Sequence, residues 1–119
     1  MLTIYHNPRC SKSRAALALT EAFAAEHGLP LEVVDYQETP PSLAQLVSLK
    51  ALLGVSAAAM VRDNEPEFAE LGLAQADETA LLEAISRHPR LLQRPIVVYR
   101  ERAVIARPPE NLAALLQAD

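Results

Sequence analysis

The chain has 119 residues, half of them apolar, which is enough for one hydrophobic core and too little for two. Its net charge of −4 argues against nucleic acid or an anionic membrane as a partner, because both require a basic excess. No apolar run approaches the ~20 residues of a spanning helix, and one cysteine cannot form an internal disulfide. We therefore expect one cytoplasmic, monomeric domain over residues 1–119.

The first third of the chain predicts a βαβ unit. Residues 1–6 are typical of a short buried strand, and residues 11–27 have the apolar periodicity of a helix that Gly28 can end. Residues 31–36 predict a second strand, with two adjacent valines at its centre. Because one helix forms the crossover, we expect the two strands to be parallel.

The middle of the chain predicts helices alone. Ser42 and Gln45 have the spacing of a capping box, and the helix they begin should end at Gly54. Shorter helical segments follow at residues 56–62, 65–71 and 78–87, broken by Pro66, Gly72 and Pro89. Together these segments form a helical insertion of about residues 42–88.

The last third predicts a β-hairpin and a helix. Residues 96–99 and 103–106 are β-rich runs joined by residues 100–102, and Pro109 suits the first turn of a helix that runs through Leu116. The order βαβ, helices, ββα is that of an α/β thioredoxin-like fold with an enlarged helical insertion. Such folds place a cis peptide before a proline that opens the third strand, so we expect a cis bond before Pro95.

Cys10 is the candidate nucleophile. It lies between a predicted strand and a predicted helix, where unpaired N–H groups and the helix dipole stabilise a thiolate and an oxyanion alike. Arg9, Lys12 and Arg14 lie within four residues and His6 is close upstream, so we expect a positive local field and a thiol pKa below ~8.5. The alternatives are a buried, inert Cys10 and a His6 that only packs at the end of its strand.

The spacing excludes two familiar cysteine chemistries. Residues 10–13 read C-x-x-S, so the chain lacks the second thiol of a dithiol cycle. Low-molecular-weight phosphatases and their arsenate-reducing relatives need C-x5-R, yet position 16 holds Ala16. Three widely separated histidines also provide no ligand set for a structural zinc. A monothiol enzyme remains, or a protein with a reactive thiol and no turnover.

A family resemblance extends this interpretation. The H-N-P-x-C-x-x-S-R signature of the glutaredoxin-coupled arsenate reductase family is similar to residues 5–14, which read YHNPRCSKSR. Later segments resemble the same family in order: residues 60–62 with 65–73, residues 94–98 (RPIVV) and residues 107–108 (RP).

The resemblance implies roles for individual residues. Cys10 would be the nucleophile, and Arg62, Arg94 and Arg107 would bind the oxyanion through bidentate guanidinium groups. Three residues would support the thiolate: His6, Ser13 and Arg14. No cofactor or metal would be bound.

The resemblance also implies the reaction. The Cys10 thiolate displaces an oxygen of arsenate, glutathione adds to the arsenic, and glutaredoxin removes the glutathione as a mixed disulfide, which releases arsenite. The single cysteine independently makes an external thiol obligatory. Two alternatives stay open: a thiol-stress regulator of the same fold that binds RNA polymerase, and a glutathione-dependent thiol reductase with another acceptor.

Overall fold

The computed structural model describes residues 2–107 and 110–117, and the chain divides into two units. The sheet unit comprises Met1–Tyr36 and Arg94–Asp119, and the helical unit comprises Gln37–Gln93. The helical unit contains the whole of the predicted insertion. Within the described residues, no helix combines the length and the apolar character that a membrane crossing requires.

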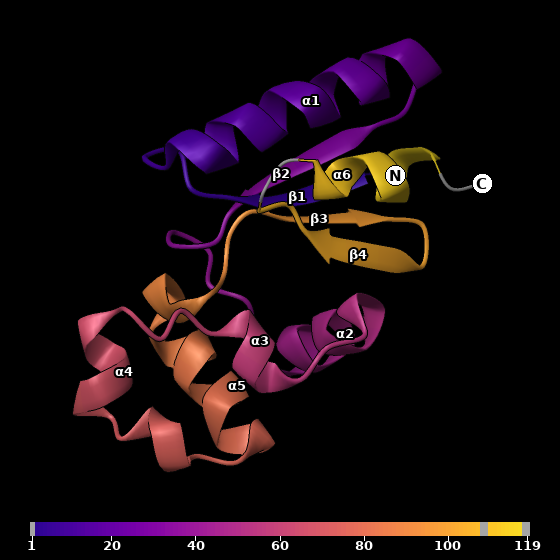
Figure 1. The fold of residues 1–119 in the computed structure, drawn as a ribbon. Coiled ribbons are helices and arrows are strands. Elements are labelled where there is room, and N and C mark those ends of the chain that lie inside the picture. Colours follow the sequence, from indigo (N-terminus) through magenta and orange to yellow (C-terminus); the bar gives the residue numbers. More distant parts are fainter. Residues whose placement is uncertain (1, 108–109, 118–119) are drawn as a thin grey trace. The chain divides into compact units, whose positions relative to one another are not determined.

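Four strands form the sheet, in the order β2-β1-β3-β4 (Figure 1). Their bounds are β1 Leu2–His6, β2 Leu31–Asp35, β3 Ile96–Tyr99 and β4 Arg102–Ile105. The β1 strand pairs parallel with β2 and antiparallel with β3, and β3 pairs antiparallel with β4. The parallel βαβ unit and the antiparallel hairpin are therefore confirmed.

The hairpin turn differs from its prediction by one residue. The β4 strand begins at Arg102, which pairs with Tyr99, so only Arg100 and Glu101 remain in the turn. Arg100 has a φ of 58°, a conformation that glycine or asparagine usually supplies in such turns. Because neither residue type is present, no local signal in the sequence predicts the short turn.

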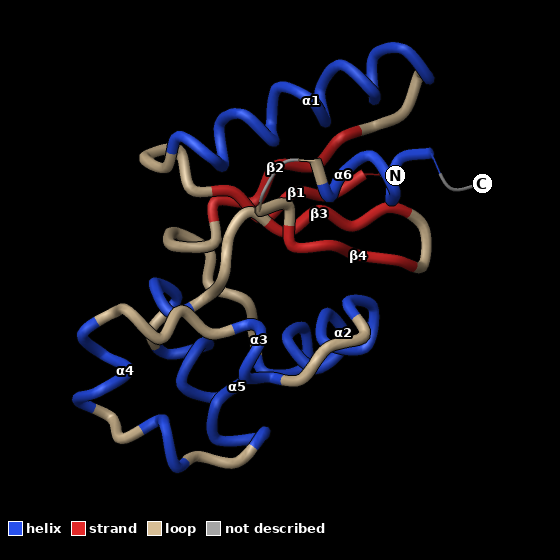
Figure 2. Tube along the Cα trace, viewed as in Figure 1, coloured by secondary structure: helices blue, strands red, loops and turns tan. Residues whose placement is uncertain are grey.

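Two helices cover one face of the sheet: α1, Ser11–His27, and α6, Asn111–Gln117 (Figure 2). The core between them includes Leu2, Ile4, Ala16, Ala24, Val97, Tyr99, Leu112 and Leu115. The α1 helix ends as predicted at Gly28, whose φ is 64° and whose N–H donates to the last turn. The predicted helix start at Pro109 lies outside the described residues.

The helical unit begins with α2, Leu43–Leu53, which has both hydrogen bonds of the predicted capping box. The Gln45 N–H donates to Ser42 Oγ at 3.2 Å, and the Ser42 N–H donates to Gln45 Oε1 at 2.8 Å. Gly54 ends the helix in the left-handed conformation. Start and end are therefore both confirmed.

The rest of the helical unit consists of short segments. The α-helices are α3 Ala57–Met60, α4 Pro66–Glu70 and α5 Glu78–Arg87, and the 3₁₀ helices are η1 Leu73–Gln75 and η2 Pro89–Leu91. Pro66 separates two helical segments, as predicted: α3 ends before it, and it is the first residue of α4, where its missing N–H needs no partner. Val61 and Leu92 form an isolated antiparallel bridge.

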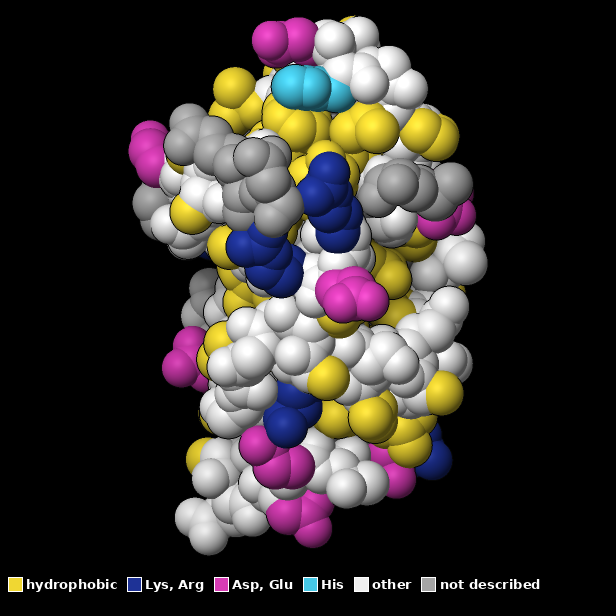
Figure 3. Space-filling view, turned by 90° about the vertical axis from the view of Figure 1, so that its right-hand side faces the viewer, with side chains coloured by type: hydrophobic (Ala, Val, Ile, Leu, Met, Phe, Trp, Pro, Cys, Tyr) yellow, Lys and Arg dark blue, Asp and Glu magenta, His cyan; other side chains and the backbone are white. Residues whose placement is uncertain are grey.

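Charge is mixed on the visible surface. Figure 3 shows basic and acidic side chains interspersed on one face, with apolar side chains between them. Because the net charge of the chain is −4, any anion site must be a local feature.

Candidate functional site

Cys10 lies at the start of α1, where its backbone is the N-cap of the helix. Its N–H donates to the Asn7 carbonyl at 3.0 Å, and its own carbonyl accepts the Arg14 N–H at 3.0 Å. The thiol is half-buried, and it does not cap the helix. The backbone thus fixes the sulfur at the positive end of a 17-residue helix, while the side chain keeps access to solvent.

The loop before Cys10 is held by two further hydrogen bonds. The Arg9 N–H donates to Asn7 Oδ1 at 3.0 Å, and Asn7 itself is buried. Arg14 Nη1 donates to the Pro8 carbonyl at 3.0 Å. Arg14 therefore braces the loop that carries Cys10, a structural contact that sequence spacing alone did not indicate.

His6 and Ser13 supply two buried polar atoms near this helix start. His6 ends β1 and is 6% exposed, Ser13 is fully buried, and His6 Nδ1 and Ser13 Oγ have no hydrogen-bond partner. Ser13 lies three residues into the helix after Cys10, and the His6 ring interacts with the Ser13 backbone. Because buried polar atoms are normally paired, these two atoms are candidate hydrogen-bonding partners for a group at the helix start.

Burial changes the protonation state that His6 favours. Desolvation lowers the pKa of His6 below its ordinary value, and this effect outweighs the Asp35 carboxylate and the Ser13 backbone, which raise it. The neutral imidazole is therefore favoured at neutral pH. At neutral pH His6 therefore adds little to the positive local field expected from the sequence, and its neutral ring can form hydrogen bonds instead.

The first residues of β3 reach the same end of the sheet. The Arg94–Pro95 peptide bond is cis, which agrees with the expectation from the sequence. Tyr5 pairs with Ile96, so extending the antiparallel register by one residue sets Pro95 opposite His6. Arg94 is half-buried, and its Nε is buried without a hydrogen-bond partner.

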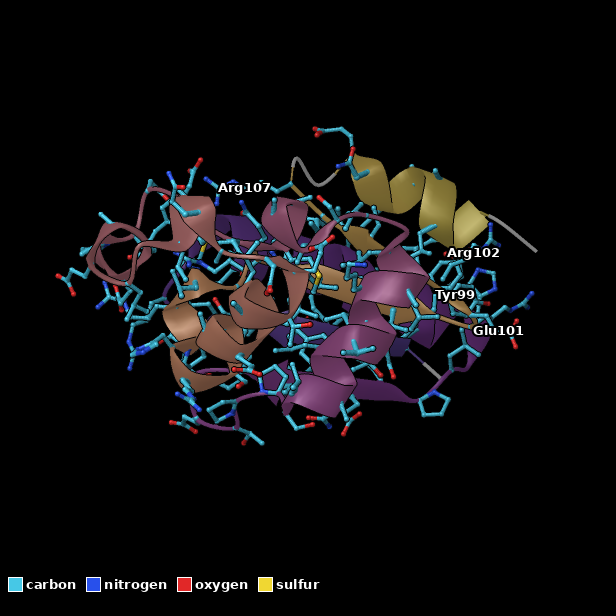
Figure 4. The ribbon with its side chains drawn as sticks, turned by 90° about the horizontal axis from the view of Figure 1, so that it is seen from below. Tyr99, Glu101, Arg102 and Arg107 are labelled. Carbon is cyan, nitrogen blue, oxygen red and sulfur yellow. The ribbon has the colours of Figure 1, made fainter. Side chains whose placement is uncertain are left out.

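Arg107 follows β4 at this end as well. Ala106, which precedes it, donates its N–H to the Pro95 carbonyl at 2.8 Å, and Arg107 itself is exposed. Figure 4 shows Arg107 well away from Tyr99, Glu101 and Arg102, which mark the hairpin turn at the opposite end of the strands. The topology thus gathers two arginines at the sheet end that carries the cysteine.

Arg62 belongs to the helical unit. It follows the Val61–Leu92 bridge, and its N–H donates to the Leu91 carbonyl at 2.7 Å. Its side chain is 11% exposed, and Nη1 lies 3.4 Å from Glu65 Oε1 without hydrogen-bond geometry. Glu65 was not predicted as a site residue, although its i+3 spacing from an arginine was a detectable signal.

The predicted site residues thus fall into two groups. Arg62 lies in the helical unit, and the sheet unit holds His6, Cys10, Ser13, Arg14, Arg94, Pro95 and Arg107. Among the described residues, no three His, Cys, Asp or Glu side chains form a group that could hold a metal ion.

Comparisons with known proteins give this arrangement a family. The ArsC family matches residues 5–115. An arsenate reductase of Neisseria meningitidis is 48% identical over 118 residues, covering 97% of both chains. An arsenate reductase of Escherichia coli is 38% identical over 117 residues, covering 97% of this chain and 80% of the relative.

A solved structure agrees with the sequence matches. The structure of an arsenate reductase from Vibrio cholerae has a TM-score of 0.85 and 41% identity to this chain, covering 95% of each. The α/β architecture described above is thus the thioredoxin-like fold of such proteins. By its sequence from residue 5 to residue 115 and by its fold, the chain belongs to the ArsC family.

Proposed function

We propose that this protein reduces arsenate to arsenite, with Cys10 as the nucleophile and with glutathione and a glutaredoxin as the reductants. The observation that carries the proposal is the position of the only cysteine at the N-terminus of α1, at the sheet end where Arg94 and Arg107 lie. Relatives named arsenate reductase, 48% and 38% identical to this chain, support the choice of substrate.

The geometry suits the attack of one anion on another. Arsenate carries about one to two negative charges near neutral pH, so it repels a thiolate. Cations and N–H donors must therefore offset the negative charge of the arsenate and that of the sulfur. The helix N-terminus serves the sulfur, and the two guanidinium groups serve the oxyanion. Arg62 is proposed as a third oxyanion ligand on the resemblance of its motif, and a neutral His6 and the Ser13 hydroxyl as hydrogen-bonding partners of the sulfur.

In the proposed reaction, the arsenic is first bonded to two thiol sulfurs and is then reduced. The Cys10 thiolate forms a sulfur–arsenic bond, and one arsenate oxygen leaves as water after protonation. The glutathione thiol displaces a second oxygen in the same way. A glutaredoxin thiolate then attacks the glutathione sulfur, forms a mixed disulfide, and leaves two electrons on arsenic. Two thiols are thereby oxidised while arsenic(V) becomes arsenic(III), and hydrolysis frees arsenite and Cys10.

The test is arsenite formation by purified protein. Wild type should produce arsenite only when arsenate, glutathione and glutaredoxin are all present, and Cys10→Ser should produce none. The rate at which iodoacetamide alkylates wild-type Cys10 should increase with pH, with a midpoint well below the pKa of ~8.5 of an ordinary thiol. Arsenate should slow the alkylation. A reactive thiol without arsenite formation, with several glutaredoxins tried, would instead favour another acceptor or a regulatory role.

A further inference from the structure

The Arg62 guanidinium already has an anionic neighbour. Glu65 Oε1 lies 3.4 Å from Arg62 Nη1, and the two side chains are only 11% and 13% exposed. The ion pair lacks hydrogen-bond geometry, so Nη1 keeps its donor capacity. A mostly buried cation is thus partly neutralised, with one donor unused.

Glu65 is itself held from the other side. Arg90 Nη2 donates to Glu65 Oε2 at 3.3 Å, and Arg90 Nη1 lies 4.0 Å from Glu67 Oε2. The Glu65 N–H also donates to the Arg62 carbonyl at 3.3 Å. Each oxygen of the Glu65 carboxylate therefore faces a different arginine, and a backbone hydrogen bond fixes the short segment between Arg62 and Glu65.

We propose that Glu65 is a resident counter-ion that competes with the oxyanion for Arg62, and so weakens and tunes oxyanion binding. A buried cation without a partner is strongly destabilising, so the folded protein needs this carboxylate before substrate arrives. The same carboxylate repels an incoming tetrahedral anion. This inference rests on the proposed role of Arg62 in oxyanion binding.

The proposal makes Glu65→Gln a gain-of-affinity variant. Glutamine removes the competing charge but retains a carbonyl oxygen that can accept from Arg62, so the guanidinium stays in position. We expect phosphate, a non-reducible tetrahedral oxyanion, to bind about tenfold more tightly, which corresponds to about 1.4 kcal/mol. Without phosphate, the variant should melt at a lower temperature than wild type.

The experiment compares the phosphate dependence of Tm in full-length wild type, Glu65→Gln and Glu67→Gln. Glu67→Gln also removes one negative charge, and Glu67, like Glu65, lies next to Arg90. Among the described ion pairs, however, none joins Glu67 to Arg62. Glu67→Gln should leave the phosphate response at the wild-type value. With arsenate as substrate, Glu65→Gln should lower KM without raising kcat, since it strengthens ground-state and transition-state binding alike.

Several outcomes would overturn the proposal. They are an unchanged or weaker phosphate response in Glu65→Gln, an equal gain in Glu67→Gln, and no phosphate response in wild type. Should Glu65→Gln fail to fold, Glu65→Asp keeps the charge on a shorter stem and should give a smaller gain; no gain there counts against the idea. If phosphate raises Tm as expected in wild type and Glu65→Gln but no arsenite forms, the proposed function is wrong and this inference is still supported.

Discussion

Arg94 and Arg107 each present a planar guanidinium, which can hold two oxygens of a tetrahedral anion at once. Lysine keeps the charge and loses this fork. We therefore expect Arg94→Lys and Arg107→Lys each to lower turnover with arsenate by about tenfold or more, given ~1.5–3 kcal/mol for a charge-assisted hydrogen bond. Steady-state kinetics would check this.

The controls are Arg87→Lys and Arg100→Lys. Arg87 lies in the last turn of α5, and Arg100 contacts Tyr99 in the hairpin turn, at the sheet end opposite Arg107. Both variants should turn over arsenate at the wild-type rate. Wild-type rates in the Arg94 and Arg107 variants would remove those residues from the proposed site.

His6 should make folding sensitive to pH. Its pKa is lowered in the folded state from an ordinary 6.5, chiefly by burial, so below that pH the unfolded chain binds more protons than the native one. The stability that the buried neutral ring allows is thus complete above pH 6.5 and is lost as the pH falls. Urea unfolding at about pH 7.5 and about pH 5 should show a smaller pH-dependent loss in His6→Asn than in wild type.

The control for His6 is the exposed His27. His27→Asn makes the same substitution at an exposed position in the last turn of α1, and its pH dependence is the reference for the His6 variant. Equal slopes for the His6 variant and wild type would show that protonation of His6 does not limit stability.

At the scale of elements, the capping box of α2 has both of its hydrogen bonds, so its contribution to stability can be tested directly. Ser42→Ala removes the acceptor for the Gln45 N–H, and we expect the free energy of unfolding to fall by about 1 kcal/mol. Ser48→Ala, an exposed change inside the same helix, should leave stability unchanged or raise it slightly. Urea denaturation of both variants would test this, and an unchanged Ser42 variant would contradict it.

Elements with strong end signals were predictable from the sequence. Gly28 and Gly54 mark helix ends because few other residues adopt positive φ at low cost, and Ser42 with Gln45 marks a start by hydrogen bonding. The 3₁₀ helices were not predicted, since three residues carry no periodicity. The start of β4 was not predicted because Arg100 has a positive φ, which its residue type does not indicate.

The candidate site was predictable to a similar degree. Cys10 and its place before α1 follow from a strand, a turn and a helix in order, all visible in the sequence. The neutral state of His6 depends on burial, and the Glu65 contact with both arginines depends on how short segments fold back. Such properties arise from tertiary structure, so local patterns do not contain them.

At the scale of the whole molecule, net charge and local field oppose each other. A net charge of −4 repels anionic reagents, whereas the arginines near Cys10 attract them. We predict that the local field prevails: relative to glutathione at the same pH, Cys10 should favour iodoacetate over iodoacetamide. Added potassium chloride should reduce this preference, because salt screens exposed charges.

The measurement is the ratio of the two alkylation rates as ionic strength increases. Arg107→Lys should keep most of the preference, since charge suffices for attraction, while Arg107→Gln should lose part of it. A ratio below that of glutathione at low salt would mean that the overall negative charge governs access to the thiol.

The backbone contacts of Cys10 bear on the entropy of activation. Its N–H and its carbonyl are both hydrogen-bonded within the fold, and the loop before it is held by Asn7 and Arg14. The ordering of the nucleophile's main chain is thus completed during folding, before the substrate binds. Attack on a bound anion should accordingly have an activation entropy near zero, which the temperature dependence of single-turnover rates would reveal.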